Sequence, residues 1–130
     1  MGFPRNDYLT AARAQNHSDD FISETLSYAD GLDCKGLPVI FDQHHLSYLL
    51  YMEHRELKQF VRSASGYYKY FAIKKRHGGL RRIMSPYSEL RDVQTWIKEN
   101  ILDKIEQPIY VTAFAKGRTI MENARMHEGR

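Results

Sequence analysis

The sequence predicts an α+β fold that is mostly helical and carries one β-hairpin. Aromatic and β-branched residues precede Gly78-Gly79, and a second short apolar run follows it. This pattern is typical of two antiparallel strands joined by a turn that needs positive φ. Elsewhere, apolar residues recur at helical spacing, with Ser or Asp where each helix would begin. A chain of 130 residues is long enough to bury a modest core.

Residues 1–41 are expected to form an N-terminal extension with one short helix. Residues 1–16 show little periodicity and predict a loosely docked segment. Ser18 is a good N-cap for a helix that ends near Tyr28, and residues 31–38 predict a loop. The apolar residues expected to be buried in this helix are Phe21, Ile22 and Leu26.

Residues 42–130 are expected to form a second region, which begins with a helix capped by Asp42. A stripe at helical spacing predicts one long helix over residues 42–62. The residues of this stripe, all expected in the core, are Leu46, Leu49, Leu50, Leu57, Phe60 and Val61.

The hairpin is expected to bury one face. Alternation along the strands places Phe71, Ile73 and Ile83 on that face, and it places Arg81 and Arg82 on opposite faces. Residues 67–82 contain six Lys or Arg and no Asp or Glu. Because the whole chain has a net charge of +3, the remainder is net negative and the positive charge is concentrated here. Such a hairpin is either a solvated basic surface or a phosphate-binding one.

Beyond the hairpin, Ser85 is a good N-cap with Pro86 in the first helical turn. The helix is expected to end near Glu106, and residues 109–114 predict a short strand. Thr119 can cap a last helix that reaches His127. The residues expected on the buried face of the longer helix are Leu90, Val93, Ile97, Ile101 and Ile105.

Several kinds of site have little support in the sequence. Cys34 is the single cysteine, so no internal disulfide or cysteine-rich zinc site can form. His44, His45 and His54 lack the i, i+4 spacing of a helical zinc motif. No apolar run is long enough to span a bilayer, so no membrane partner is expected and the chain is predicted to be cytoplasmic. A hydrolase is not indicated, since no nucleophile elbow or Walker loop occurs.

An ordered series of partial motifs resembles a known family. The pattern runs from Phe71 through Lys74, Gly78-Gly79, Arg81 and Ile83 to Pro86. It continues with Glu89-Leu90, Gln94, Trp96-Ile97, Ala113-Phe114, Gly117-Arg118-Thr119-Ile120, Asn123-Ala124 and His127. This series resembles the fingers of bacterial retron-type reverse transcriptases, and group II intron reverse transcriptases look similar over the same span.

The resemblance implies the fingers subdomain of an RNA-directed DNA polymerase without its palm. The partners would be an RNA template, a DNA primer and a dNTP, and a cognate structured non-coding RNA is a further possible partner. Arg81 looks like the fingers arginine that contacts the triphosphate, and its partner lysine is Lys74 or Lys75. The residues expected at template and primer are Tyr68, Tyr70, Arg76, Arg82, Lys116, Arg118 and Asn123.

The same resemblance implies that this chain is not catalytic alone. In the family, Mg²⁺ is held by palm aspartates, which this sequence lacks, so no cofactor, metal ligand or catalytic residue is expected here. Tyr28-Ala29-Asp30-Gly31 resembles the metal-binding Tyr-x-Asp-Asp but lacks its second aspartate. The alternative is a stand-alone, non-catalytic module that binds RNA or a protein. The sequence leaves open whether the parent belongs to a retron, a group II intron or an antiviral defence system.

Overall fold

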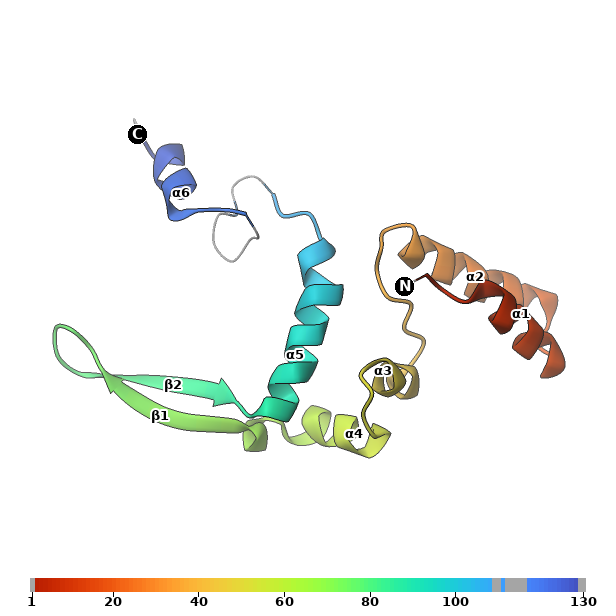
Figure 1. Cartoon of the computed structure of the whole chain (residues 1–130), viewed down its shortest axis with the longest axis horizontal. Coiled ribbons are helices and arrows are strands. Elements are labelled where there is room, and N and C mark those ends of the chain that lie inside the picture. Colours follow the sequence, from red (N-terminus) through yellow and green to blue (C-terminus); the bar gives the residue numbers. More distant parts are fainter. Residues whose placement is uncertain (1, 109–110, 112–116, 129–130) are drawn as a thin grey trace. The chain divides into compact units, whose positions relative to one another are not determined.

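A computed structural model describes residues 2–108, 111 and 117–128 of the chain. It forms two compact units, of which one comprises Met1–Pro38 and Lys98–Arg130 and the other Val39–Ile97. Figure 1 shows helices for most of the described chain and a single two-stranded antiparallel sheet. The predicted α+β class, mostly helical with one hairpin, is therefore confirmed.

The N-terminal segment contains two helices rather than one, α1 (Arg5–Ala14) and α2 (Asp19–Asp33). They share a small core of Ala12, Ile22 and Leu26, against which Phe3, Tyr8 and Leu9 pack. The prediction that residues 1–16 are loosely docked is therefore wrong. The missed signal is the spacing of Tyr8, Leu9 and Ala12, which places all of them on one side of a short helix.

The first residue of α2 is where the sequence predicts it, whereas the last residue is not. The Phe21 backbone N–H donates to Ser18 Oγ, which confirms the predicted cap. Phe21 itself is exposed and stacks on the ring of His17, so its predicted burial is wrong. The helix continues to Asp33, past the predicted end. It is closed by Gly36, whose φ of 66° allows the Leu37 N–H to reach the Leu32 carbonyl.

The long helix predicted over residues 42–62 is interrupted, which gives α3 (Gln43–Leu49) and α4 (His54–Ser63). Asp42 caps α3 as predicted, since the His45 N–H donates to its carboxylate at 2.8 Å. The interruption centres on Tyr51, which adopts the left-handed conformation with φ of 53°. The Met52 N–H donates to the Ser47 carbonyl and the Tyr51 N–H to the Tyr48 carbonyl, both at 3.1 Å. This is the Schellman motif, which ends a helix.

The core of the second unit lies between α4 and α5 (Ser88–Asn100). Leu57 and Phe60 of α4 pack against Leu90 and Val93 of α5, as their helical spacing predicts. Several half-buried residues extend this core: Leu46, Leu50, Met52, Tyr67, Tyr68 and Ile97. Val61 is exposed, so its assignment to the buried stripe is wrong.

The boundaries of α5 differ from the predicted ones. Ser85 and Pro86 belong to strand β2 (Leu80–Pro86), where Pro86 pairs with Tyr68, so they do not start the helix. A 3₁₀ turn over Leu102–Lys104 follows the helix well before the predicted end. Ile105 lies beyond this turn and is exposed, contrary to its predicted burial.

The C-terminal helix α6 (Ile120–Met126) begins as predicted. Thr119 and Glu122 form a capping box, in which each side chain accepts a hydrogen bond from the backbone N–H of the other residue. The strand predicted over residues 109–114 lies almost entirely outside the described residues. Among the helices of the described residues, none is long and apolar enough to cross a membrane.

Candidate nucleic-acid interface

The hairpin consists of β1 (Tyr68–Lys74) and β2, paired in one antiparallel register. At its tip, the Gly78 N–H donates to the Lys75 carbonyl at 3.3 Å, and the Lys75 N–H donates to the Gly79 carbonyl at 3.0 Å. Gly78 and Gly79 have φ of 93° and 80°. The predicted turn with positive φ is therefore confirmed, and glycine is required there because other residues are strained in this conformation.

The register divides the hairpin side chains between two faces, because residues opposite each other in an antiparallel pair project to the same side. One face, called here the Arg81 face, carries Lys69, Phe71, Ile73, Arg81 and Ile83. The other, called the Arg82 face, carries Tyr68, Tyr70, Lys74, Leu80, Arg82 and Met84. The predicted separation of Arg81 from Arg82 is thus present.

The same register separates the two lysines that the sequence left equivalent. Lys74 is paired with Leu80, which places it on the Arg82 face. Lys75 lies one residue beyond the end of β1, and its N–H donates to the Gly79 carbonyl. If the strand alternation continues over this residue, Lys75 is the lysine that shares a face with Arg81. Arg76 lies exposed in the turn itself.

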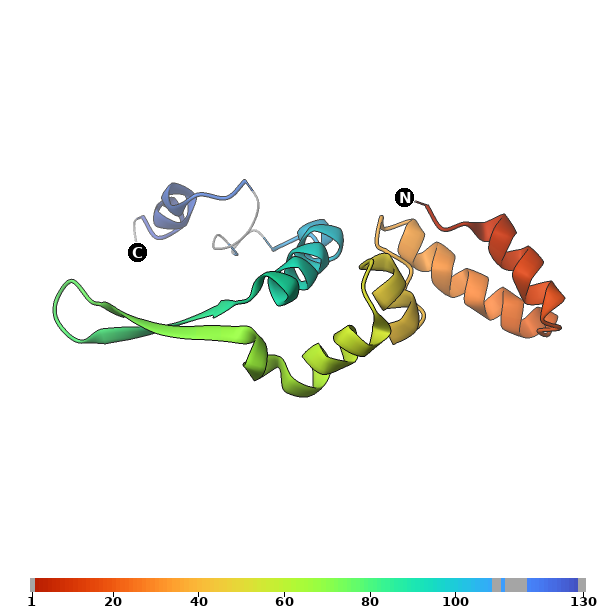
Figure 2. The same ribbon diagram turned by 60° about the horizontal axis from the view of Figure 1, so that its bottom comes forward.

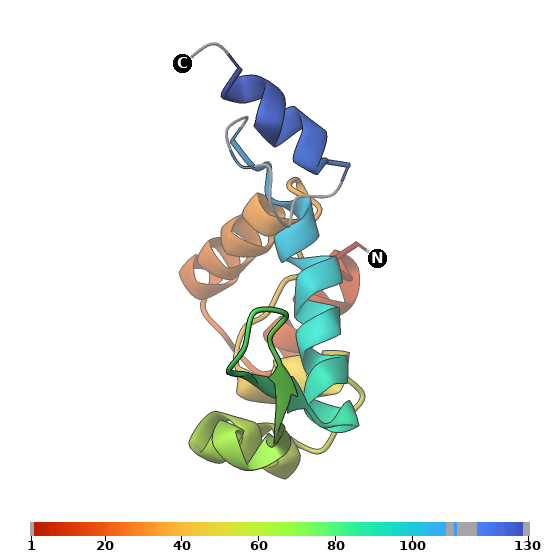
Figure 3. The same ribbon diagram turned by 90° about the vertical axis from the view of Figure 1, so that its left-hand side faces the viewer.

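Both faces of the hairpin are open. Phe71 is 50% exposed and Ile73 is 45% exposed, so their predicted burial is wrong, whereas Ile83 is half-buried. The reason is that the core between α4 and α5 reaches only the base of the hairpin. Figure 2 shows the strands extending well beyond these helices, and Figure 3 views the hairpin from its tip, in front of α5. The cations near the turn accordingly stand in solvent.

The base of the hairpin is anchored by its tyrosines. Tyr67 packs its ring edge-on against Phe60, and its hydroxyl donates to Gln59 Oε1 at 3.0 Å. Gln94 Nε2 of α5 donates to the hydroxyl of Tyr68 at 2.7 Å. Tyr68 is therefore half-buried at this anchor, whereas the ring of Tyr70 is exposed and available for stacking. Of the two tyrosines expected at template and primer, only Tyr70 has an open ring.

No carboxylate of the residues that the structure describes forms an ion pair with the hairpin. The ion pairs within the described part of the chain join Arg5 to Asp30 and Lys98 to Asp103, and neither involves the hairpin. In the second pair, the hydrogen bond and charge of Asp103 raise the pKa of Lys98. Lys69 Nζ lies 5.3 Å from the centroid of the Tyr87 ring, which is a cation–π contact at the base. The other cations of the hairpin have no ion-pair partner among the described residues.

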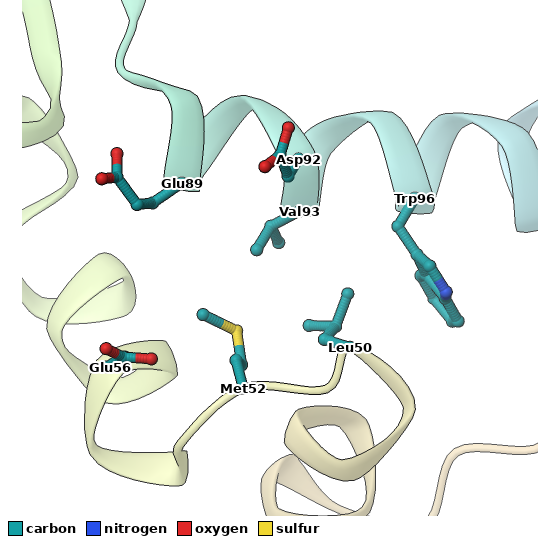
Figure 4. Close-up of a pocket in the computed structure, with 7 residues that line it drawn as sticks. All are labelled: Leu50, Met52, Glu56, Glu89, Asp92, Val93 and Trp96. Atoms are coloured by element: carbon teal, nitrogen blue, oxygen red, sulfur yellow. The ribbon is translucent and has the colours of Figure 1, made fainter.

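A cavity of about 350 Å³ lies beside the core of the same unit (Figure 4). Leu50, Met52 and Val93 form its apolar part, with Trp96 at one end. Glu56 and Glu89 lie together at the other end, and Asp92 completes the lining. Hydrogen bonds from its own backbone and from the Ser88 hydroxyl lower the pKa of Glu89. Since these carboxylates repel phosphate, the cavity does not suit an anionic ligand.

The remaining expected contacts lie near α6. Arg118 and Asn123 are exposed on either side of the Thr119 cap. Lys116 lies outside the described residues. Arg118 and Asn123 are thus accessible to solvent.

The histidines do not assemble a metal site. His44 and His54 stack with ring centroids 3.5 Å apart, which joins the ends of α3 and α4. His45 accepts a hydrogen bond from the Phe41 N–H. Within residues 2–108, 111 and 117–128, no group of three His, Cys, Asp or Glu converges to hold a metal ion.

Comparison with known proteins points to polymerases that copy RNA into DNA. No family model matches the chain. The retron Ec86 reverse transcriptase of Escherichia coli is 30% identical over 96 residues, which cover 72% of this chain and 30% of that protein. The retron Mx162 reverse transcriptase of Myxococcus xanthus is 35% identical over 78 residues, which cover 58% of this chain and 15% of that protein. The retron Ec73 enzyme of Escherichia coli is 36% identical over 59 residues.

These matches confirm the resemblance to retron reverse transcriptases over parts of the chain. A continuous match over 72% of a chain of 130 residues necessarily includes the hairpin, which lies in the middle of the sequence. The chain spans less than a third of the length of these curated relatives. It is therefore a region related to a reverse transcriptase.

Proposed function

We propose that this chain is the fingers part of a retron-type reverse transcriptase and that its hairpin binds phosphate groups of a dNTP and of the template–primer duplex. The observation that carries the proposal is the hairpin itself. It is open on both faces, it has six Lys or Arg and no carboxylate, and it lies in the region similar to retron reverse transcriptases. Unpaired cations of this kind supply most of the affinity for polynucleotide phosphates.

Arg81 and Lys75 are the residues proposed to bind the triphosphate. Both lie near the tip, where Gly78 and Gly79 turn the chain, and strand alternation extended by one residue supports a common face for them. A guanidinium is planar and can donate to two phosphate oxygens at once, whereas an ammonium acts as a point charge. This pair therefore provides one group that orients the triphosphate and one that neutralises it.

The Arg82 face is proposed to contact the template. Lys74 and Arg82 supply charge there, and the exposed ring of Tyr70 lies between them and the base of the hairpin. Aromatic rings stack on bases irrespective of sequence, which suits a polymerase that copies any template. Arg76 at the turn, Arg118 and Asn123 are proposed as further contacts.

Nucleotide transfer is proposed to occur in the complete enzyme and not in this chain. The metal ions of such a reaction stabilise the attacking and leaving oxygens. The proposed role of this region is to bind and orient the dNTP and the template–primer duplex.

The test uses fluorescence anisotropy with an RNA–DNA template–primer, at salt concentrations from about 50 to 200 mM. Lys75→Gln/Arg81→Gln is compared with Arg13→Gln/Lys35→Gln, which removes the same charge from exposed positions in the other unit. The hairpin variant should reduce the slope of log affinity against log salt by about 1.8, and the control should not. Equal slopes would reject the hairpin as a phosphate-binding site.

A second variant tests the triphosphate role separately. Arg81→Lys keeps the charge and removes the planar fork, so the salt slope for template–primer should remain that of the wild type. Affinity for a dNTP should fall, because the two parallel hydrogen bonds are lost. Unchanged dNTP affinity would contradict the assignment of Arg81. Binding of a protein partner that is insensitive to salt would instead favour the stand-alone module.

A further inference from the structure

The outer face of α4 carries a second concentration of positive charge. Arg55, Lys58 and Arg62 are all exposed, and none of them forms an ion pair with the described part of the chain. With 3.6 residues per turn, Arg55 and Arg62 lie within about 20° of each other around the helix, and Lys58 lies about 60° from Arg55. The three cations therefore form one stripe, called here the α4 stripe.

The stripe points away from the rest of its unit. The buried residues of α4 are Leu57 and Phe60, which pack against α5. Their mean direction is about 180° from that of Arg55 and Arg62 on a regular helix. Figure 3 shows α4 below α5, with no other element of residues 39–97 beneath it. The stripe thus faces outward over the full length of the helix.

Carboxylates are segregated from this stripe. Glu53 precedes the first turn as the N-cap residue, and Glu56 lies on the side of α4 that lines the cavity against α5. An ordinary solvated helix surface mixes both signs of charge, which supports the helix through pairs at i, i+4. The outer face of α4 carries one sign only, so like charges repel there unless an external anion neutralises them.

We propose that the α4 stripe contacts the phosphate backbone of a double-helical nucleic acid at a surface separate from the hairpin. Arg55 and Arg62 are about 10 Å apart along the helix axis at 1.5 Å per residue. This distance matches about three steps of 3.4 Å of rise along one strand, so Arg55 and Arg62 are spaced like phosphates about three nucleotides apart along the duplex axis. The inference rests on the proposed function only in taking nucleic acid as the ligand, and it does not require the hairpin to bind nucleic acid.

A duplex fits this face better than an acidic protein does. Stable protein interfaces have a centre of aromatic or large apolar anchors, whereas backbone contacts need only cations and polar groups. Val61 is the single exposed apolar residue beside the stripe, and the outer face of α4 has no aromatic residue. The stripe is therefore suited to fix the position of a duplex without reading its sequence.

The test compares Arg55→Gln/Arg62→Gln with the matched control Arg13→Gln/Lys35→Gln in the full chain. Affinity for a blunt duplex of about 20 base pairs, made as RNA–RNA, RNA–DNA and DNA–DNA, is measured from about 50 to 200 mM salt. Removing two phosphate contacts should lower the salt slope by about 1.8, so the variant should lose about tenfold less affinity over this range than the wild type. The Trp96 fluorescence of each variant shows that the fold is retained.

The outcomes separate the two proposals. A lower slope in the α4 variant than in the control supports the inference, and the duplex types that show it identify the nucleic acid. A slope equal to that of the control overturns it. If the hairpin variant alone has a lower slope, the proposed function stands and this inference fails. If wild type binds poly-glutamate as tightly as duplex and the α4 variant loses both equally, the stripe binds acidic protein and the inference is also overturned.

Discussion

Replacing Tyr51 by glycine should stabilise the unit formed by residues 39–97. Tyr51 occupies the left-handed position of the Schellman motif between α3 and α4, with φ of 53°, and its side chain is 93% exposed. An L-residue in this conformation costs roughly 1–2 kcal/mol. Glycine removes that strain but loses about 0.5–1 kcal/mol of backbone entropy on folding. Because the exposed ring contributes little packing, the net gain should be about 0.5–1 kcal/mol.

Tyr48→Gly is the matched control, since it is the same chemical change three residues earlier. Tyr48 is 77% exposed but lies within α3, so glycine there should destabilise by about 0.5 kcal/mol through lower helix propensity. Trp96 is the single tryptophan and lines the cavity beside Leu50 and Met52, so its fluorescence reports unfolding of this unit.

In urea, with a slope of about 1 kcal/mol per molar for a unit of this size, the midpoint should rise by about 0.5–1 M for Tyr51→Gly and fall for Tyr48→Gly. A midpoint that falls in both variants would refute the reasoning, because it would show that the Tyr51 side chain contributes more than its strain costs.

Three further predictions concern the core, the first cap of this unit and the turn. Phe60→Ala should lower the free energy of unfolding by about 3–5 kcal/mol, because Phe60 is part of the buried core, and it should abolish the cooperative unfolding transition seen by Trp96 fluorescence. Val61→Ala, at an exposed position, should leave this transition in place. The hydrogen bond from the His45 N–H lowers the pKa of Asp42, so the cap's contribution is complete above its ordinary pKa of 3.8 and is lost as pH falls through the lower value of the folded state. In Asp42→Asn, the urea midpoint should therefore change less over this acidic pH range than it does in the wild type. An unchanged pH profile would contradict the assignment of Asp42 as the source of this pH dependence. Gly79→Ala should destabilise the hairpin by about 1–2 kcal/mol, because alanine is strained at positive φ, and its amide hydrogens should exchange faster. Gly66→Ala should leave the exchange unchanged, because φ is not positive at Gly66.

The elements that the sequence predicted correctly are those defined by local chemistry. Ser18, Asp42 and Thr119 cap helices because a side-chain oxygen accepts a nearby N–H, and Gly78-Gly79 turns the hairpin because it tolerates positive φ. The Arg81 and Arg82 faces followed in the same way from strand alternation. Such features depend on a few neighbouring residues, so a single sequence is enough to predict them.

The errors arose where distant contacts or an unfavourable residue decided the structure. The interruption at Tyr51 was missed because nothing in a tyrosine predicts a left-handed conformation, which tertiary packing of Met52 helps to enforce. Burial of Phe71 and Ile73 was predicted from alternation, which identifies a face but not what covers it. The sequence did not give the strand register, which pairs Lys74 with Leu80 and is set by the turn hydrogen bonds.

The bare edges of the two-stranded sheet have a consequence for solubility. Among the described residues, each strand of the hairpin has an edge of backbone N–H and C=O groups without a strand partner, beside exposed apolar side chains. Such edges invite pairing with the same hairpin of another molecule, and lysines are a common means of preventing it. The like charges of residues 67–82 make two hairpins repel each other. A short polyanion that neutralises these charges without covering the strands should therefore promote aggregation, and excess salt should reverse it by releasing the polyanion.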